Sequence, residues 1–526
     1  MSAPGWQLQH SYAQLPAPLH ALVQPTAVAA PRMVIFNADL AETLGLDVSA
    51  LDEPQRAALF SGNRLPPGAK PLAQAYAGHQ FGHFTMLGDG RAILLGEQQL
   101  PAGGCVDVQL KGAGRTPYSR GGDGRAALGP MLREYLISEA LQALNIPSTR
   151  SLAVVASGEP VLREGQLPGA VLTRVASSHI RVGTFQYARQ DLASLKALTD
   201  YSIARHAPQA AAADNPALAL LDAVLDKQAY LISEWLRVGF IHGVMNTDNM
   251  TISGESIDFG PCAFMDEFDL ATVYSSIDRR GRYAYGNQAP IAHWNLSRFA
   301  ETLLPLISDQ EQEAVQLATA VINGFESCFH RHWLAMMRRK LGLLGERDDD
   351  RSLAEDLLRL LQDQRLDHTN SFLALMAGDN PAVTQAAKEP FDHWLERWRE
   401  RRGGARQPEG ESQALMQAAN PQLIPRNHRV EHALQQASQH QNLQPFENLL
   451  AALRQPYALR PEHRAYQQPP TPDEVVPATY CGPEAACTQP RRKCRTTGSC
   501  WANCARCCSR RHCGSARSPI WRWPRC

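Results

Sequence analysis

The hydrophobic pattern between residues 91 and 175 is that of β-strands. Residues 106–111 alternate strictly, with Val106, Val108 and Leu110 on one face and a polar face that ends at Lys111. A period of two is typical of a half-buried strand, and it predicts that Lys111 stands at the C-terminal end of the polar face. Three further strands are predicted at 91–97, 152–156 and 169–175.

Helical periods begin between these strands and then dominate the chain. From residue 126 to 144, apolar residues recur at every fourth position from Leu132, and Glu134 lies off that face. After about residue 185, helical patterns fall at 220–238, 296–345, 351–376, 388–402 and 429–454. A small strand-rich part followed by a larger helical part predicts an α+β fold with two lobes.

The same patterns predict four units along the chain. Residues 1–60, which read as loops with short helical pieces such as 36–46, should form an N-terminal extension that packs on the core. Residues 61–183 are the predicted small, strand-rich lobe, and residues 184–483 are the predicted larger, helical lobe. Residues 484–526 are predicted to be a disordered tail.

The predicted tail differs sharply in composition from the rest. It holds ten Lys or Arg and one acidic residue, and nine of the twelve cysteines lie from Cys481 onward. We interpret it as a frame-shifted or read-through extension, with a zinc site around Cys504-x-x-Cys507 as the alternative. The other 483 residues hold 42 basic and 51 acidic residues, a balance that disfavours nucleic-acid binding.

Composition also bears on location. Only Cys105, Cys262 and Cys328 precede the tail region, so a disulfide framework is not expected. No apolar run approaches the roughly 18 residues of a membrane span, and the first twenty residues lack the features of a signal peptide. We predict a cytoplasmic protein with neither membrane nor nucleic acid as a partner.

The strongest chemical signal is the segment 241–260. A kinase catalytic loop reads His-Arg-Asp, four residues, then Asn. His242 and Asn249 keep that spacing, but Val244 stands where the catalytic Asp should be, and valine cannot accept a proton. Nine residues on, Asp258-Phe-Gly matches the kinase metal-binding triplet. The chain therefore keeps the residues that hold a metal-bound nucleotide while lacking the usual base.

Individual roles follow from residue chemistry. An Asn amide oxygen and an Asp carboxylate are ligands that Mg²⁺ prefers, so Asn249 and Asp258 are the candidate metal ligands, brought together by a hairpin that turns at 253–254. Asp248 is the nearest carboxylate that could replace the missing base. Lys111 is expected to pair with Glu134 and to neutralise nucleotide phosphates, as in kinases.

Other candidates are weaker on their own. Gly88-Asp-Gly-Arg91 is also a common turn, Asp123-Gly124 precedes a helix whose amides could meet an anion, and arginines are common on surfaces. Two arginine forks near a triphosphate could hold its terminal phosphates. The candidate nucleotide-binding residues are thus Gly88, Gly90, Arg91, Lys111, Asp123, Gly124, Arg174, Arg181 and Asp258.

Several long motifs together resemble the selenoprotein O family, whose bacterial members are called YdiU. They include Gln109-Leu-Lys-Gly-Ala-Gly-Arg-Thr-Pro-Tyr-Ser-Arg120, the loop His242–Asn249, Asp258-Phe-Gly-Pro261 and Gly281-Arg-Tyr-Ala-Tyr-Gly-Asn-Gln288. The resemblance covers essentially residues 1–483. It implies a kinase-like fold that binds ATP in a flipped orientation and transfers AMP, with release of diphosphate, to Ser, Thr or Tyr hydroxyls of proteins; some members also transfer UMP from UTP with Mn²⁺.

Carried to matching positions, the resemblance implies specific roles. The residues named above bind the nucleotide, Asn249 and Asp258 bind Mg²⁺ or Mn²⁺, and Asp248 accepts the proton. It also implies that Cys481, near the usual end of the family, is a redox-active thiol, and Cys262 is the nearest guess for a partner. Two alternatives stay open: a protein kinase that transfers the γ-phosphate with Asp248 as base, and a catalytically inactive nucleotide-binding scaffold.

Overall fold

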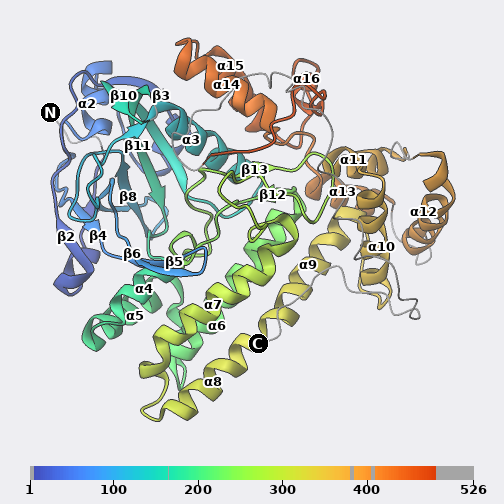
Figure 1. The fold of residues 1–526 in the computed structure, drawn as a ribbon, viewed down its shortest axis with the longest axis horizontal. Helices are drawn as coiled ribbons and strands as arrows, with labels where there is room; N and C mark the ends of the chain where they lie inside the picture. The colour runs from blue at the N-terminus through green and yellow to red at the C-terminus, as the bar shows by residue number, and fades with distance from the viewer. Residues whose placement is uncertain (1–4, 164, 380–383, 404–408, 481–526) are drawn as a thin grey trace, which may run out of the picture.

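The structure is a computed structural model that describes residues 5–163, 165–379, 384–403 and 409–480. The predictions for the tail, including Cys481 and the alternative zinc site, lie outside these residues. Figure 1 shows a strand-rich part at one side of the molecule and helices extending from it.

One antiparallel sheet forms the strand-rich part. Its nine strands include the path β2-β4-β7-β8-β11-β10-β3, with β1 paired to β7 and β9 paired to β11. A separate two-stranded hairpin is made by β5 (Ala77–Gln80) and β6 (His83–Met86). The bounds of the sheet strands are β1 Leu8–Gln9, β2 His20–Leu22, β3 Arg32–Phe36, β4 Leu72–Gln74, β7 Ala92–Gln99, β8 Cys105–Lys111, β9 Ala126–Ala127, β10 Arg150–Leu162 and β11 Gln166–Ala176.

The four predicted strands are present, and the N-terminal region differs from its prediction. Residues 1–60 contribute β1, β2 and β3 to the main sheet, with the short helices α1 (Ala38–Thr43) and α2 (Glu53–Ser61) after them. Strands of two to five residues are too short for a period of two to stand out. The lobe and domain boundaries stay predictions.

The strand β8 is buried on both faces, which corrects the half-buried prediction. Asp107 and Gln109 are as buried as Val108 and Leu110, and Lys111 is 6% exposed. Each polar side chain has a charged or polar partner: Asp107 meets Arg205, Gln109 meets Arg174, and Lys111 meets Glu134. Paired in this way, polar side chains can be buried without the large desolvation cost of isolated ones.

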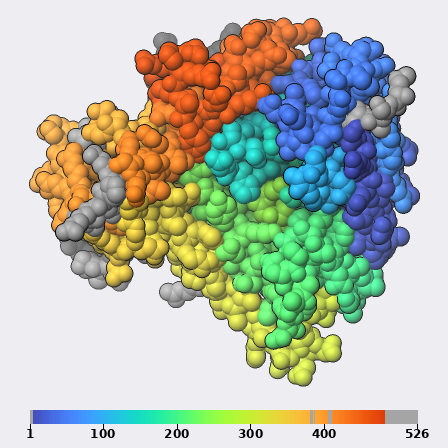
Figure 2. Space-filling view, turned by 180° about the vertical axis from the view of Figure 1, so that it is seen from behind, coloured from blue at the N-terminus to red at the C-terminus, as the bar shows by residue number. Residues whose placement is uncertain are grey.

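Helix α3 (Leu128–Ala143) covers one face of the sheet. Its leucines at 132 and 136 pack with Val154 of β10 and Leu172 of β11. The C-terminal helices α14 (Asn427–Gln439) and α15 (Gln444–Leu453) pack in the same apolar cluster, and Figure 2 shows them in orange beside the teal α3. The helix that carries Glu134 is therefore held between the sheet and the helices α14 and α15.

The remaining helices form the larger part. Their core is one apolar cluster around α6 (Pro216–Arg237), which runs beside α7 and α9 (Figure 1). The predicted helix at 296–345 is three helices, because Ser308–Gln310 and Gly324 interrupt it, and α13 was not predicted. The other helices are α4 Val182–Ala188, α5 Leu192–His206, α7 Gln288–Ile307, α8 Glu311–Asn323, α9 Phe325–Leu341, α10 Asp350–Asp363, α11 His368–Ala377, α12 Lys388–Gly403, α13 Glu409–Ala419 and α16 Arg464–Gln467.

The catalytic loop lies between two short paired strands, β12 (Phe240–Ile241) and β13 (Ala263–Phe264). The predicted hairpin between Asn249 and Asp258 is a closed loop without a ladder of its own: Thr251 bridges to Arg181 and Ser256 bridges to Ser148. The turn at Gly254 is present, with φ +83°, and the Thr251 hydroxyl joins the two limbs by bonding both the N–H and the carbonyl of Glu255. The α+β class and the two-lobed arrangement are as predicted.

Candidate active site

A cavity of about 290 Å³ lies where β8, β11 and α3 meet the catalytic loop. Residues from both the strand-rich and the helical part line it, which is the expected place for a kinase-like site. Eight of the predicted site residues are among them: Gly90, Arg91, Lys111, Arg174, Arg181, Asp248, Asn249 and Asp258.

Asp258 is the centre of the charges in this cavity. Its Oδ1 lies 2.6 Å from Lys111 Nζ and 2.7 Å from an Arg174 guanidinium nitrogen. Its Oδ2 lies 2.5 Å from Arg181. Asp258 has φ +64°, a left-handed conformation that non-glycine residues adopt rarely and that recurs at functional sites.

Glu134 anchors two of the same cations from the opposite side. Its Oε2 lies 2.6 Å from Lys111 Nζ and its Oε1 lies 3.0 Å from Arg174. The predicted Lys111–Glu134 pair is therefore confirmed. These three cations can neutralise phosphate oxygens, while Asp89 and Asp248 bring further carboxylates into the same cavity.

Burial and charge oppose each other at Asp258. Burial disfavours its ionised form, but Lys111, Arg181 and Arg174 outweigh burial and hold the pKa of Asp258 well below its usual range. The carboxylate is therefore ionised at neutral pH, with 23% of its side chain exposed to the cavity.

Asp248 has the opposite environment. Its Oδ1 is buried without a hydrogen-bond partner among the described residues, and burial raises the pKa of Asp248 to about 6. The backbone around it is tight: the Asp248 carbonyl accepts a hydrogen bond from Arg181, and a Cβ on Gly78 would stand 2.4 Å from Oδ1. Asp248 is thus a fixed carboxylate that is mostly ionised above neutral pH, as a general base requires.

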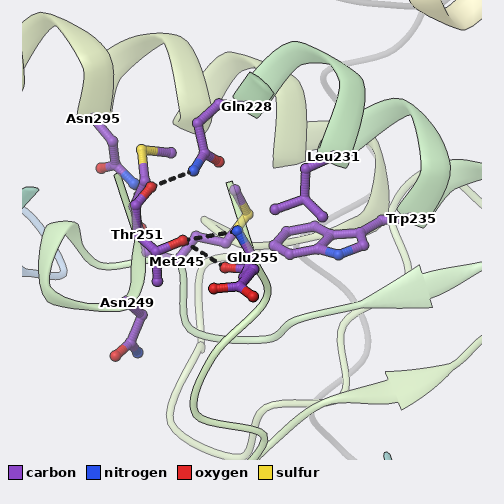
Figure 3. Close-up of a pocket in the computed structure, with 9 residues that line it drawn as sticks. Gln228, Leu231, Trp235, Met245, Asn249, Thr251, Glu255 and Asn295 are labelled. Atoms are coloured by element: carbon purple, nitrogen blue, oxygen red, sulfur yellow. Dashed lines mark hydrogen bonds between the residues drawn. The ribbon is translucent and has the colours of Figure 1, made fainter. Parts of the chain in front are cut away.

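Asn249 is oriented by its own loop. Its side-chain N–H donates to the Val244 carbonyl at 2.9 Å, so the amide oxygen faces the other way. A small second cavity of about 10 Å³ lies behind the loop, lined in part by Trp235 and Glu255. Figure 3 shows the Asn249 side chain pointing away from the other residues of that second cavity.

These oxygens suit a hard divalent cation. The ionised Asp258, the Asn249 amide and the unpartnered Asp248 oxygen line one cavity, and oxygen ligands of this kind bind Mg²⁺ or Mn²⁺. His242 supports the arrangement from below, because its buried ring bonds the carbonyl of Ile257, the residue before Asp258.

Three predicted residues do not line the cavity. Gly88 packs against the Tyr118 ring with φ +105°, and Gly124 lies against the backbone of Gly114. The Asp123 carboxylate forms a two-pronged ion pair with Arg163, at 2.7 and 3.0 Å. All three shape the glycine-rich segment near the site, and a direct nucleotide contact from them stays a prediction.

Asp89 is a residue of this site that the sequence did not indicate. Its carboxylate accepts hydrogen bonds from the Gln74 backbone and from Gln109, and burial raises the pKa of Asp89 to about 6. Asp89 lines the same cavity. The only signal was its place inside Gly88-Asp-Gly90, a pattern that ordinary turns share.

The comparisons with known proteins agree with this geometry. The family model described as protein adenylyltransferase SelO matches residues 6–454. Proteins named protein nucleotidyltransferase YdiU are similar to the chain: one from Halalkalibacterium halodurans is 56% identical, covering 91% of this chain and 98% of its own length. Those from Shouchella clausii and Nitrosococcus oceani are each 54% identical, covering 91% of this chain and 99% and 97% of their own lengths.

Within the described residues, no helix has both the length and the apolar character needed to cross a bilayer. The family model matches residues 6–454, and the relatives are more than half identical over 91% of this chain. The chain belongs to the protein adenylyltransferase SelO family.

Proposed function

We propose that this protein transfers AMP from ATP to Ser, Thr or Tyr hydroxyls of other proteins in the cytoplasm, with Mg²⁺ or Mn²⁺ as the cofactor and with UTP as a second donor. The observation that supports this most is the cluster around Asp258. Three buried cations and two acidic groups meet in one cavity beside Asp248 and Asn249. A kinase-like frame without the usual catalytic Asp fits a chemistry other than γ-phosphoryl transfer.

In the proposed reaction, the acceptor hydroxyl oxygen attacks the α-phosphorus of ATP. The bond from that phosphorus to the bridging oxygen breaks, diphosphate leaves, and the hydroxyl proton passes to the Asp248 carboxylate. Lys111, Arg174 and Arg181 neutralise the charge that grows on the leaving diphosphate. Asn249 and Asp258 would hold the divalent cation, which when bound polarises phosphate oxygens as a Lewis acid.

Labelled ATP tests this function. We expect purified protein to attach the α-phosphate label, and not the γ-phosphate label, to proteins of a cell lysate. Transfer of the γ label would instead identify a kinase. If neither the α label nor the γ label is transferred to protein, the result would favour an inactive scaffold.

The site assignment has its own test. We expect Asp258→Ala to abolish α-label transfer and to weaken binding of metal-bound ATP, because three buried cations lose their shared anion and the site loses a ligand. The exposed Asp226, whose side chain is 52% exposed, offers the matched control Asp226→Ala, which should keep transfer within about twofold. Wild-type transfer by Asp258→Ala would show that the site lies elsewhere.

A further inference from the structure

We propose that a third cavity, beside the active site, binds acidic residues that flank the acceptor hydroxyl of the protein substrate. This cavity, here called the arginine groove, measures about 820 Å³ and includes Arg279, Arg280, Arg282, Phe81 and Ile277 in its walls. The inference rests on the proposed transfer of AMP to proteins and names the substrate class that the same site prefers.

The arginine groove adjoins the active site. Phe81 and Ile277 line both cavities, so a chain segment lying in the groove is next to the cleft. Ile277 is 42% exposed, although it is a large apolar residue. An exposed apolar side chain beside a reaction cavity is the kind of contact that an extended peptide covers.

The free charges of the groove are positive. Arg279 and Arg280 are exposed, and neither forms an ion pair with any residue that the structure describes. Among the described residues that line the groove, the acidic one is Asp278. It is 6% exposed, and its two oxygens accept the backbone N–H groups of Arg282 and Tyr283. Guanidinium groups without partners favour carboxylates, which they can bind through two parallel hydrogen bonds.

The segment 277–283, which carries the three arginines, is also fixed to the catalytic loop. The Tyr283 hydroxyl donates to Asn246 Oδ1 at 2.6 Å, and the same oxygen accepts the backbone N–H of Phe81 at 3.0 Å. Asn246 lies two residues before Asp248, so one side chain holds both walls of the groove at a set distance from the proposed base. The Arg282 guanidinium stacks over the Trp294 ring, 4.8 Å from its centroid. An acidic residue bound here therefore sets the register of the hydroxyl.

A pair of peptides tests the groove. Both carry the same acceptor hydroxyl; one has three flanking Glu residues and the other has Gln at those positions. With saturating metal and α-labelled ATP, we expect the wild type to prefer the Glu peptide about tenfold in kcat/KM, the scale of two partly exposed ion pairs. We expect Arg279→Glu/Arg280→Glu to remove or invert the preference. Added salt should weaken it in the wild type.

The control applies the same charge change far from the cleft. Lys388 and Arg399 are exposed on α12, so Lys388→Glu/Arg399→Glu should keep the tenfold preference. Binding of metal-bound ATP should be equal in all three proteins. The proposal would be overturned by equal kcat/KM for the two peptides in the wild type. It would also be overturned if Arg279→Glu/Arg280→Glu kept the preference for the Glu peptide.

Peptide binding measured by fluorescence anisotropy distinguishes a failure of the groove proposal from a failure of the proposed function. Tighter binding of the Glu peptide that depends on Arg279 and Arg280 would uphold the groove even if no AMP were transferred, and would then count against the function alone. The groove is instead a nucleotide site if the two peptides bind alike, the wild type binds two equivalents of adenine nucleotide, and Arg279→Glu/Arg280→Glu binds only one. That result would overturn the proposal.

Discussion

Asp248 and Asp258 show how one cavity can give two carboxylates different properties. Asp258 lies among three cations, which keep its pKa low. Asp248 has a buried oxygen with no hydrogen-bond partner in the part of the chain that the structure describes, and burial raises its pKa to about 6. The first is suited to a permanent charge and the second to exchange of a proton. This contrast could not be read from the sequence, where both are aspartates in short polar loops.

We expect Asp248→Asn to separate activity from stability. Transfer should fall by about 100- to 10,000-fold, the range for loss of a general base, while metal-bound ATP still binds. The folded protein should be as stable as the wild type or more stable at pH 8, because an unfavourable buried charge is removed. Transfer rates, nucleotide titration and thermal melting measure the three quantities.

The exposed Asp200, whose side chain is 60% exposed, provides the comparison. Asp200→Asn should leave transfer, binding and melting temperature unchanged. An Asp248→Asn protein that kept wild-type transfer would remove Asp248 from the mechanism.

At the scale of elements, close backbone contacts seat the catalytic loop. Helix α4 begins beside β5, and a Cβ on Gly183 would stand 2.0 Å from the Ala77 carbonyl oxygen and 3.3 Å from the Asp248 Cα. No side chain fits there unless the hairpin or the loop shifts. Because Gly183 has no side chain, α4, β5 and the catalytic loop can lie this close together.

We expect Gly183→Ala to destabilise the protein by about 1–3 kcal/mol, the usual cost of overpacking, and to lower transfer as well, because the Asp248 backbone must move. Gly129→Ala is the matched control. The nearest atom to a Cβ on Gly129 of α3 is 3.8 Å away, so alanine fits and should stabilise the helix slightly. Denaturant unfolding compares the two; equal stability of both variants would contradict this account of the packing.

Helices and strands with a strong hydrophobic period could be predicted from the sequence. The extent to which their polar faces are buried could not. The alternation in β8 and the four-residue period in α3 indicated the element types correctly. Alternation alone could not reveal that the polar face of β8 is covered, since its partners Arg174 and Arg205 come from distant elements. For the same reason, the convergence of Lys111 and Arg174 on Asp258 required the fold, while the Lys111–Glu134 pair followed from local order.

At the scale of the whole molecule, Glu255 links the sheet to the catalytic segment. Its carboxylate accepts hydrogen bonds from the backbone and hydroxyl of Ser177, just after β11, and from the Ser253 hydroxyl. Burial nevertheless raises the pKa of Glu255 to about 7, with Asp107 adding to the effect. Lys227 lies close enough for its charge to interact with Glu255.

This environment has a defined effect on stability. Because the folded pKa lies above the unfolded value, the folded state binds more protons between about pH 4.5 and 7, and the contribution of Glu255 falls as pH rises through that window. We expect Glu255→Gln to lack this fall. The stability of the variant relative to the wild type should therefore increase from pH 5 to pH 8, by at most about 3 kcal/mol.

The difference between the two proteins is the quantity to measure. The buried histidines act in the opposite direction, since burial lowers the pKa values of His179 and His206 and the folded state loses stability as pH falls. These terms are common to both proteins and cancel in the subtraction. Melting curves at four pH values suffice, and a constant difference would show that Glu255 does not titrate abnormally.

The covered polar face of β8 bears on which changes in chain length the protein tolerates. Inserting or deleting one residue within Cys105–Lys111 would exchange the two faces of the strand, so Lys111 would point away from Glu134 and valines would meet Arg174 and Arg205. The turn before the strand has no such restriction, since Gly103 and Gly104 have open space around them. Length variation among natural or designed versions of this chain should therefore gather at that turn and spare the strand.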